Sequence, residues 1–136
     1  MIIGFTGSRA GMTPSQREQV VEYLGFAHHV VHGDCIGGDE DFHELALEMG
    51  IPITIHPPED PKLRAFCKGA SAMMPAMPYL VRDRAIVARS DLLLGAPKEA
   101  IEPVPGRGQG TWSTIRYARK QRCPLVIIWP KTKATE

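Results

Sequence analysis

Three glycine-containing segments hold the residues that point most directly to chemistry. They read Pro-Gly-Arg-Gly-Gln-Gly-Thr over 105–111, Gly-Asp-Cys-Ile-Gly-Gly-Asp over 33–39, and Gly-Ser-Arg over 7–9. Glycine lets backbone amides approach an anion closely, and the start of a following helix adds unpaired N–H groups and partial positive charge. Each segment follows a short apolar stretch. We therefore predict that the three segments surround a phosphate-bearing ligand of nucleotide size.

In the 105–111 segment, the predicted phosphate donors are backbone amides and one hydroxyl: Gly106, Gly108, Gln109, Gly110 and Thr111. The segment is not a P-loop, because no Gly-Lys-Ser/Thr follows, and its spacing is GxGxG rather than GxGxxG. The alternative is a surface loop in which Thr111 only caps the next helix.

Two arginines are expected to assist the amides. The turn at Gly7 offers the Ser8 hydroxyl and the Arg9 guanidinium, and arginine pairs with phosphate through two parallel hydrogen bonds. On a predicted helix, Arg82 is expected to face the same cleft, while Arg84 lies on another face and pairs with an acid outside. The alternative is that these arginines are solvated surface residues.

The predicted ligand contacts of the second segment are Gly33, Gly37, Gly38 and Asp39. Carboxylates repel phosphate, so Asp39 is expected to meet a ribose hydroxyl or the edge of a base. The alternatives are a Mg²⁺ site built from Asp34, Asp39 or Asp41, and a plain helix cap. We predict no resident cofactor, no metal site and no catalytic residue, because metal-ligand spacing is absent and Cys35 has no evident activating base.

Length and composition indicate one ordinary globular domain. The chain has 136 residues, 43% of them hydrophobic and 23% charged. No apolar run approaches the roughly 20 residues of a membrane span. Because the first residues read as a strand, we expect no signal peptide. Three widely spaced cysteines fit a reducing cytoplasm. We expect one domain over 1–130 and a flexible tail over 131–136.

Charge is divided unevenly along the chain. Residues 1–61 hold two basic and ten acidic residues, whereas residues 62–136 hold fourteen basic and five acidic ones. The basic half favours an anionic ligand, and the acidic half argues against a broad nucleic-acid surface. Because the two halves carry opposite charge, a homodimer is plausible.

Strand and helix patterns alternate throughout the chain. Short apolar, β-branched runs predict strands near 2–5, 29–32, 52–56, 91–95 and 124–128. Amphipathic runs predict helices near 14–27, 39–49, 79–89 and 111–121. This alternation predicts an α/β fold: a single three-layer, Rossmann-like domain with a five-stranded parallel sheet in the order 3-2-1-4-5. The ligand would then lie at the carboxyl ends of the strands, near the switch point.

The proline-rich stretch over 57–78 departs from this alternation. A loop of this length in a small domain is usually functional or mobile. One interpretation is a flap beside the ligand, with Lys62, Arg64 or Lys68 reaching an anion; the other is a surface excursion without a role.

These motifs together resemble the SLOG superfamily, Rossmann-like proteins that sense or process nucleotides and their derivatives. The resemblance covers nearly the whole chain outside 57–78 and the tail. It lies in the residues of 4–9, 32–39, 82–91, 105–111 and 115–118. The resemblance implies that the chain binds a nucleotide or a nucleotide-derived ligand. We predict a compact protein of this kind without strong catalytic equipment, to which Mg²⁺ is an optional addition.

Two branches of this superfamily supply alternatives. Lonely-guy enzymes are phosphoribohydrolases with a GGxGTxxE signature, and Arg82 is similar to their paired arginine. Here Thr114 stands where that glutamate belongs, so an N-glycosidic cleavage would need Asp39 or Glu40 instead. The residues of 37–47 resemble the DNA-processing protein A family, which implies a single-stranded nucleic-acid module. The acidic helix at 39–49 makes nucleic acid the less favoured partner.

Overall fold

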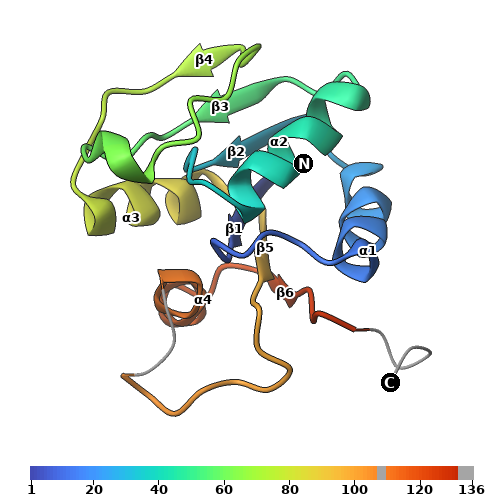
Figure 1. The fold of residues 1–136 in the computed structure, drawn as a ribbon, viewed down its shortest axis with the longest axis vertical. Coiled ribbons are helices and arrows are strands. Elements are labelled where there is room, and N and C mark those ends of the chain that lie inside the picture. Colours follow the sequence, from blue (N-terminus) through green and yellow to red (C-terminus); the bar gives the residue numbers. More distant parts are fainter. Residues whose placement is uncertain (107–109, 132–136) are drawn as a thin grey trace.

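A computed structural model describes residues 1–106 and 110–131, in which strands and helices alternate along the chain (Figure 1). The strands are β1 (Ile2–Gly7), β2 (His29–His32), β3 (Ile53–Ile55), β4 (Ala72–Met73), β5 (Leu92–Ala96) and β6 (Leu125–Ile127). The α-helices are α1 (Pro14–Leu24), α2 (Gly38–Glu48), α3 (Tyr79–Arg89) and α4 (Gly110–Lys120), and a short 3₁₀ helix, η1, covers Pro61–Leu63. None of the helices in this described part is long and apolar enough to cross a membrane.

The described strands form one parallel sheet in the order β4-β3-β2-β1-β5-β6. The prediction of a five-stranded sheet in the order 3-2-1-4-5 is therefore wrong. The five predicted strands keep their relative positions, and β4 adds a sixth outside β3, where Thr54 pairs with Ala72 and Ile55 with Met73. Two exposed residues between prolines carry no alternating pattern, so nothing local in the sequence marks them as a strand.

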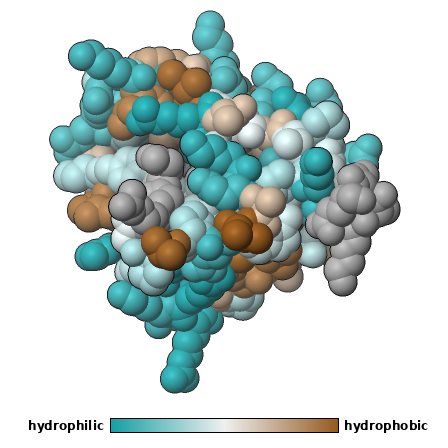
Figure 2. Space-filling model, turned by 60° about the horizontal axis from the view of Figure 1, so that its bottom comes forward, coloured by the Kyte–Doolittle hydropathy of each residue, from teal (hydrophilic) through white to brown (hydrophobic). Residues whose placement is uncertain are grey.

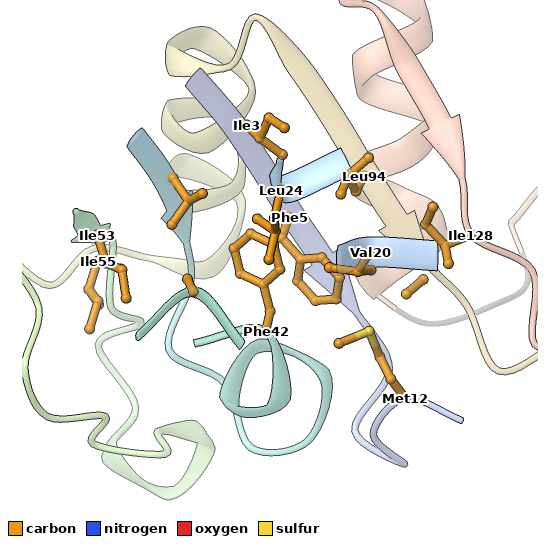
Figure 3. Close-up of a cluster of buried hydrophobic side chains, with 13 residues drawn as sticks. Ile3, Phe5, Met12, Val20, Leu24, Phe42, Ile53, Ile55, Leu94 and Ile128 are labelled. Atoms are coloured by element: carbon orange, nitrogen blue, oxygen red, sulfur yellow. The ribbon is translucent and has the colours of Figure 1, made fainter. Parts of the chain in front are cut away.

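Helices cover both faces of the sheet and make the three-layer arrangement (Figure 1). On one face α1 and α2 bury the larger core, in which the rings of Phe5 and Phe42 stack 4.5 Å apart (Figure 3). On the other face α3 and α4 pack Ile86, Val87 and Ala118 over the central strands. Burial on both faces explains why the central strands are continuously apolar.

Local signals fix the helix starts well and the helix ends less well. Thr13 caps α1 through a capping box with Gln16, and Pro14 occupies the first turn, as predicted. The helix ends at Leu24 rather than residue 27, because Gly25 follows it at the C-cap. Both amide hydrogens of Gln16 are donated to the Pro97 and Ile128 carbonyls at 2.8 Å, which ties α1 to the ends of two other strands.

The 57–78 segment is closed and anchored. Its ends pair with each other, since Glu59 donates its N–H to Met77 and Met77 donates its N–H to Pro57. The buried Asp34 carboxylate receives the Arg64 Nε at 2.9 Å and the Cys67 N–H at 2.9 Å. Arg64 is therefore turned toward this acid, and the prediction that it reaches an anion is not supported.

Candidate functional site

A cavity of about 500 Å³ lies at the carboxyl ends of β1, β2 and β5. The β1–α1 turn, the β2–α2 turn, α3, the residues after β5 and the start of α4 form its walls, and Leu63 of η1 adds one side. Six of the predicted ligand residues line this cavity: Gly7, Ser8, Arg9, Asp39, Arg82 and Gly110. This is the edge of a parallel sheet at which ligands are expected to bind.

Two of the glycine segments meet because their backbones lie in direct contact. A Cβ on Gly37, whose φ is +98°, would overlap the backbone carbonyl of Arg9. A Cβ on Gly38 would lie 2.9 Å from Gly7 Cα, and the Gly38 N–H donates to the Ser8 carbonyl at 2.8 Å. The start of α2 is thereby held against the first turn.

Of the remaining predicted residues, the five that the structure describes do not line the cavity. Gly33, Gly37 and Gly38 lie behind its wall, where they allow close packing. Thr111 is buried, and Gly106 adopts a φ of +84° with open space around it. Gly108 and Gln109 lie outside the described residues, as does most of the predicted tail.

Arg82 reaches the cavity with its guanidinium already engaged by protein groups. Its Nη1 donates to the Gly33 carbonyl at 2.7 Å and contacts Cys35 Sγ at 3.3 Å, and its Nε lies 2.9 Å from Asp83 Oδ1. Only 3% of Arg82 is exposed. Arg82 lines the cavity, as predicted. Its guanidinium, however, contacts neighbouring protein groups and so holds the wall of the cavity together. Arg84 lies over the ring of Tyr117, and it forms no ion pair with any described residue.

The free positive charge lies at the rim. Arg9 and Lys98 line the cavity and are exposed. Among the described residues neither forms an ion pair. Sequence reasoning missed Lys98, although its position three residues after the predicted fourth strand was an available signal.

The negative charge lies deeper. Burial raises the pKa of Asp39 to about 6, against the opposing effect of Arg82. Burial likewise raises the pKa of Asp83 to about 6, again opposed by Arg82. Asp83 was missed because a single acid between two arginines looks like a solvated helix face. The cavity therefore combines exposed cations with buried carboxyl groups.

Thr114 and Tyr79 complete the wall near α4. The Thr114 hydroxyl donates to the Gly110 carbonyl at 3.0 Å, within the first turn of the helix. Tyr79 packs so closely on Gly110 that a Cβ there would overlap its hydroxyl, and the Arg82 guanidinium lies 4.8 Å from its ring centroid. Burial raises the pKa of Tyr79 to about 12, so it remains a neutral phenol at neutral pH.

Two buried histidines lie beside the cavity in a chain of hydrogen bonds. The Asp34 N–H donates to His32 Nδ1 at 2.9 Å, so His32 Nε2 carries the proton that bonds His43 Nδ1 at 2.8 Å. His43 Nε2 then donates to the Lys68 carbonyl at 2.7 Å. Burial, followed by the neighbouring His43, lowers the pKa of His32 to about 3, which keeps it neutral.

These hydrogen bonds argue against metal binding at the one described cluster of potential ligands, which consists of His32, His43 and Cys67. Every ring nitrogen of the two histidines is engaged, so no lone pair is free to bind an ion.

The acids suggested for Mg²⁺ also have partners. Asp34 pairs with Arg64, Asp41 pairs with Arg17 at 2.8 Å, and Asp39 accepts the Cys35 N–H at 3.0 Å. Burial raises the pKa of the Cys35 thiol to about 11, which makes it a poor nucleophile.

Solved structures share this fold. The molybdenum cofactor binding protein from the phototrophic bacterium Rippkaea orientalis is similar with a TM-score of 0.66 and 18% identity, over 93% of this chain and 74% of that one. The molybdenum cofactor carrier protein from Chlamydomonas reinhardtii is similar with a TM-score of 0.67 and 18% identity, over 98% and 78%. Neither a protein-family model nor a curated protein sequence matches the chain. At this level of identity the likeness shows a Rossmann-like α/β fold.

Proposed function

We propose that this protein binds a nucleotide or a nucleotide-derived ligand in the cavity at the carboxyl ends of β1, β2 and β5. The observation that carries the proposal is the division of charge in this cavity, with exposed Arg9 and Lys98 at its rim and buried Asp39 and Asp83 below them. Such a division suits a molecule with an anionic group at one end and polar hydrogen-bond donors at the other. The resemblance to the SLOG superfamily points to the same ligand class.

In this proposal the phosphate lies at the rim. There it meets Arg9, Lys98, the Ser8 turn and the start of α4 at Gly110, where helix N–H groups add partial positive charge. The ribose or base extends toward Asp39. Arg82 positions the wall by holding the Gly33 carbonyl and Asp83.

The first test is stabilisation by ligand. Saturation at 100 times Kd is expected to add about 2.7 kcal/mol to the free energy of unfolding. Thermal unfolding should therefore be measured with a panel of nucleoside monophosphates, diphosphates, dinucleotides and cyclic nucleotides. Because two structural neighbours are described as binding or carrying the molybdenum cofactor, that compound belongs in the panel. A melting temperature unchanged by every compound contradicts the proposal.

Replacing either rim cation should weaken phosphate binding. Arg9→Ala and Lys98→Ala are each expected to raise Kd about tenfold, because each removes a charge-assisted hydrogen bond. Lys120→Ala is the matched control, since it removes one positive charge from the exposed far end of α4. Isothermal titration calorimetry gives the Kd values. An equal effect in the control would indicate long-range charge rather than contact.

A second candidate is hydrolysis of the N-glycosidic bond of a nucleoside monophosphate, and Asp83 is the observation that favours it. Thr114 stands where the Lonely-guy glutamate belongs, but Asp83 lies in the same cavity with a pKa raised by burial to about 6. A carboxyl group near that pKa is suited to general acid–base work. The cavity is lined by two carboxyl groups, those of Asp39 and Asp83. Glu40, which the sequence suggested as an alternative, does not line it.

This candidate predicts free base in the presence of a nucleoside monophosphate. Release should fall at least 100-fold in Asp83→Asn, as is typical when a general acid or base is removed. Chromatography of products across the common monophosphates is the measurement. Absence of any released base from the wild-type protein rejects the activity and leaves the binding proposal intact.

We further propose that the protein works in the cytoplasm and can form a homodimer. Its three cysteines are free, which fits a reducing compartment. On the face shown in Figure 2, hydrophobic residues are scattered among hydrophilic ones instead of forming one continuous patch.

Binding of single-stranded nucleic acid is the third alternative. Such binding would be strongly salt-dependent, so measuring affinity for a single strand across a range of salt concentrations checks it.

A further inference from the structure

One oxygen of the cavity wall lacks a partner. Asp83 Oδ2 is buried, and no described residue donates a hydrogen bond to it. Only 10% of the Asp83 side chain is exposed, and it lines the cavity. Arg82 lies on the other carboxyl oxygen, 2.9 Å from Oδ1. The Thr114 hydroxyl lies beside the carboxyl group, but its single proton is directed to the Gly110 carbonyl.

Such an oxygen requires a donor. Burying a charged acceptor without a hydrogen bond costs more free energy than burying a neutral one. A ligand group that donates to this oxygen therefore binds more favourably. A phosphate cannot serve, because it is itself negative and offers acceptors. Asp39 lies in the same cavity and strengthens the exclusion of anions from this end.

We propose that Asp83 is a specificity determinant, which selects ligands that present an N–H or O–H donor at the end of the molecule remote from the phosphate. This inference rests on the proposed function, because it concerns the nucleotide assigned to the same cavity. Two parts of a nucleotide carry such donors, the amino group of a base and the hydroxyls of the ribose. Asp83 thereby fixes which way round the ligand enters.

The charged groups around Asp83 determine how this selection depends on pH. Arg82 of α3 favours the ionised form of the carboxyl group. Asp39, Cys35, Tyr79 and Thr114 line the same cavity. Arg9 and Lys98 also line it and supply positive groups at its rim. Since the pKa of Asp83 is about 6, the acceptor is present above pH 6 and is lost as the pH falls below it. Affinity for a donor-bearing ligand should fall in the same direction.

The experiment compares guanosine 5′-monophosphate with two analogues at pH 7.5. Inosine 5′-monophosphate lacks the exocyclic amino group, and 2′-deoxyguanosine 5′-monophosphate lacks one ribose hydroxyl. One of these two donors is expected to face Asp83. The analogue without that donor should bind the wild-type protein about 10- to 100-fold more weakly than guanosine 5′-monophosphate, the range for a hydrogen bond to a charged group. Asp83→Asn should reduce that preference to under about threefold. Glu22→Gln, which neutralises an exposed acid on α1, should keep it.

A second measurement follows the pH dependence of affinity, first in the wild-type protein and then in Asp83→Asn. A wild-type Kd that does not change between pH 7 and pH 5 overturns the role of Asp83, whether or not the variant folds. Guanosine 3′,5′-cyclic monophosphate is a phosphodiester, so its phosphate does not titrate near pH 6. Its Kd should rise up to about tenfold between pH 7 and pH 5 in the wild-type protein, and the rise should be clearly smaller in Asp83→Asn. Asp39 also titrates near pH 6, so the difference between the two proteins isolates Asp83.

The outcomes separate the inference from the function on which it rests. Nucleotide binding with no preference between the analogues, or a preference that Asp83→Asn retains, overturns the role of Asp83 alone. Failure of every nucleotide to bind the wild-type protein overturns the proposed function and the inference together.

Discussion

Replacing Gly37 with alanine is expected to lower the free energy of unfolding by about 3–5 kcal/mol, through backbone strain and overpacking together. Gly37 has a φ of +98° and a ψ of −116°, a conformation that is reserved almost entirely for glycine. The added Cβ would also overlap the Arg9 carbonyl group, which is backbone and has no rotamer that moves it aside. Urea unfolding followed by circular dichroism is the measurement.

Gly50→Ala is a matched control for this substitution. Gly50 also has a positive φ, +70°, but no atom lies within 4 Å of the position of its Cβ. It therefore carries only the strain of a left-handed residue, about 1–2 kcal/mol. If the two variants lose equal stability, the contact between Gly37 and Arg9 contributes nothing, and the packing of the two turns needs another explanation. If Gly37→Ala loses more, the same variant should also weaken ligand binding, because the Arg9 turn moves.

Removing Arg64 is expected to destabilise the protein by about 3 kcal/mol, near the lower end of the range for breaking a buried ion pair. The Arg64→Ala substitution leaves Asp34 fully buried and without its counter-charge. The remaining Cys67 N–H bond to Asp34 limits the loss. We also expect faster amide hydrogen exchange over 61–70, because this pair anchors the segment beside the cavity.

An exposed ion pair of similar geometry provides the comparison. Arg17 lies 2.8 Å from Asp41, but 39% of the Arg17 side chain and 17% of the Asp41 side chain are exposed. Arg17→Ala should therefore cost at most about 1 kcal/mol, as is usual at a surface. Equal losses in the two variants would contradict a special role for burial. They would also remove the argument that Asp34 anchors the 57–78 segment.

The Gly37 and Arg64 predictions concern the residues that hold the cavity in shape, which we call the frame of the site. The Arg9, Lys98 and Asp83 predictions concern contacts with the ligand. Gly37 brings the β2–α2 turn against the β1–α1 turn, and Asp34 fixes the segment that presents Leu63 to the cavity. A loss of binding in either frame variant should accompany a loss of stability. A loss of binding in Arg9→Ala should leave stability nearly unchanged, because Arg9 is exposed and forms no ion pair with any described residue.

Local patterns in the sequence predicted the elements of this protein well. Period and capping signals, such as Thr13 and Pro14 before α1, are local properties of the chain. The glycine turns were predicted to meet at the carboxyl ends of parallel strands, and Gly7, Ser8, Arg9 and Gly110 do line one cavity. Alternation of strand and helix was sufficient for that inference, because right-handed crossovers place all such turns at one edge.

What the sequence by itself determined was therefore the alternation of strands and helices, the edge of the sheet at which the cavity lies and the cationic turn of Arg9. Tertiary structure alone decided the pairing of β4, the commitment of Arg82 to Gly33 and Asp83, and the depth of the two carboxyl groups. The reason is physical. Burial, pKa and hydrogen-bond partnership depend on groups that are distant in the chain, and no local pattern records which of them the fold will bring together.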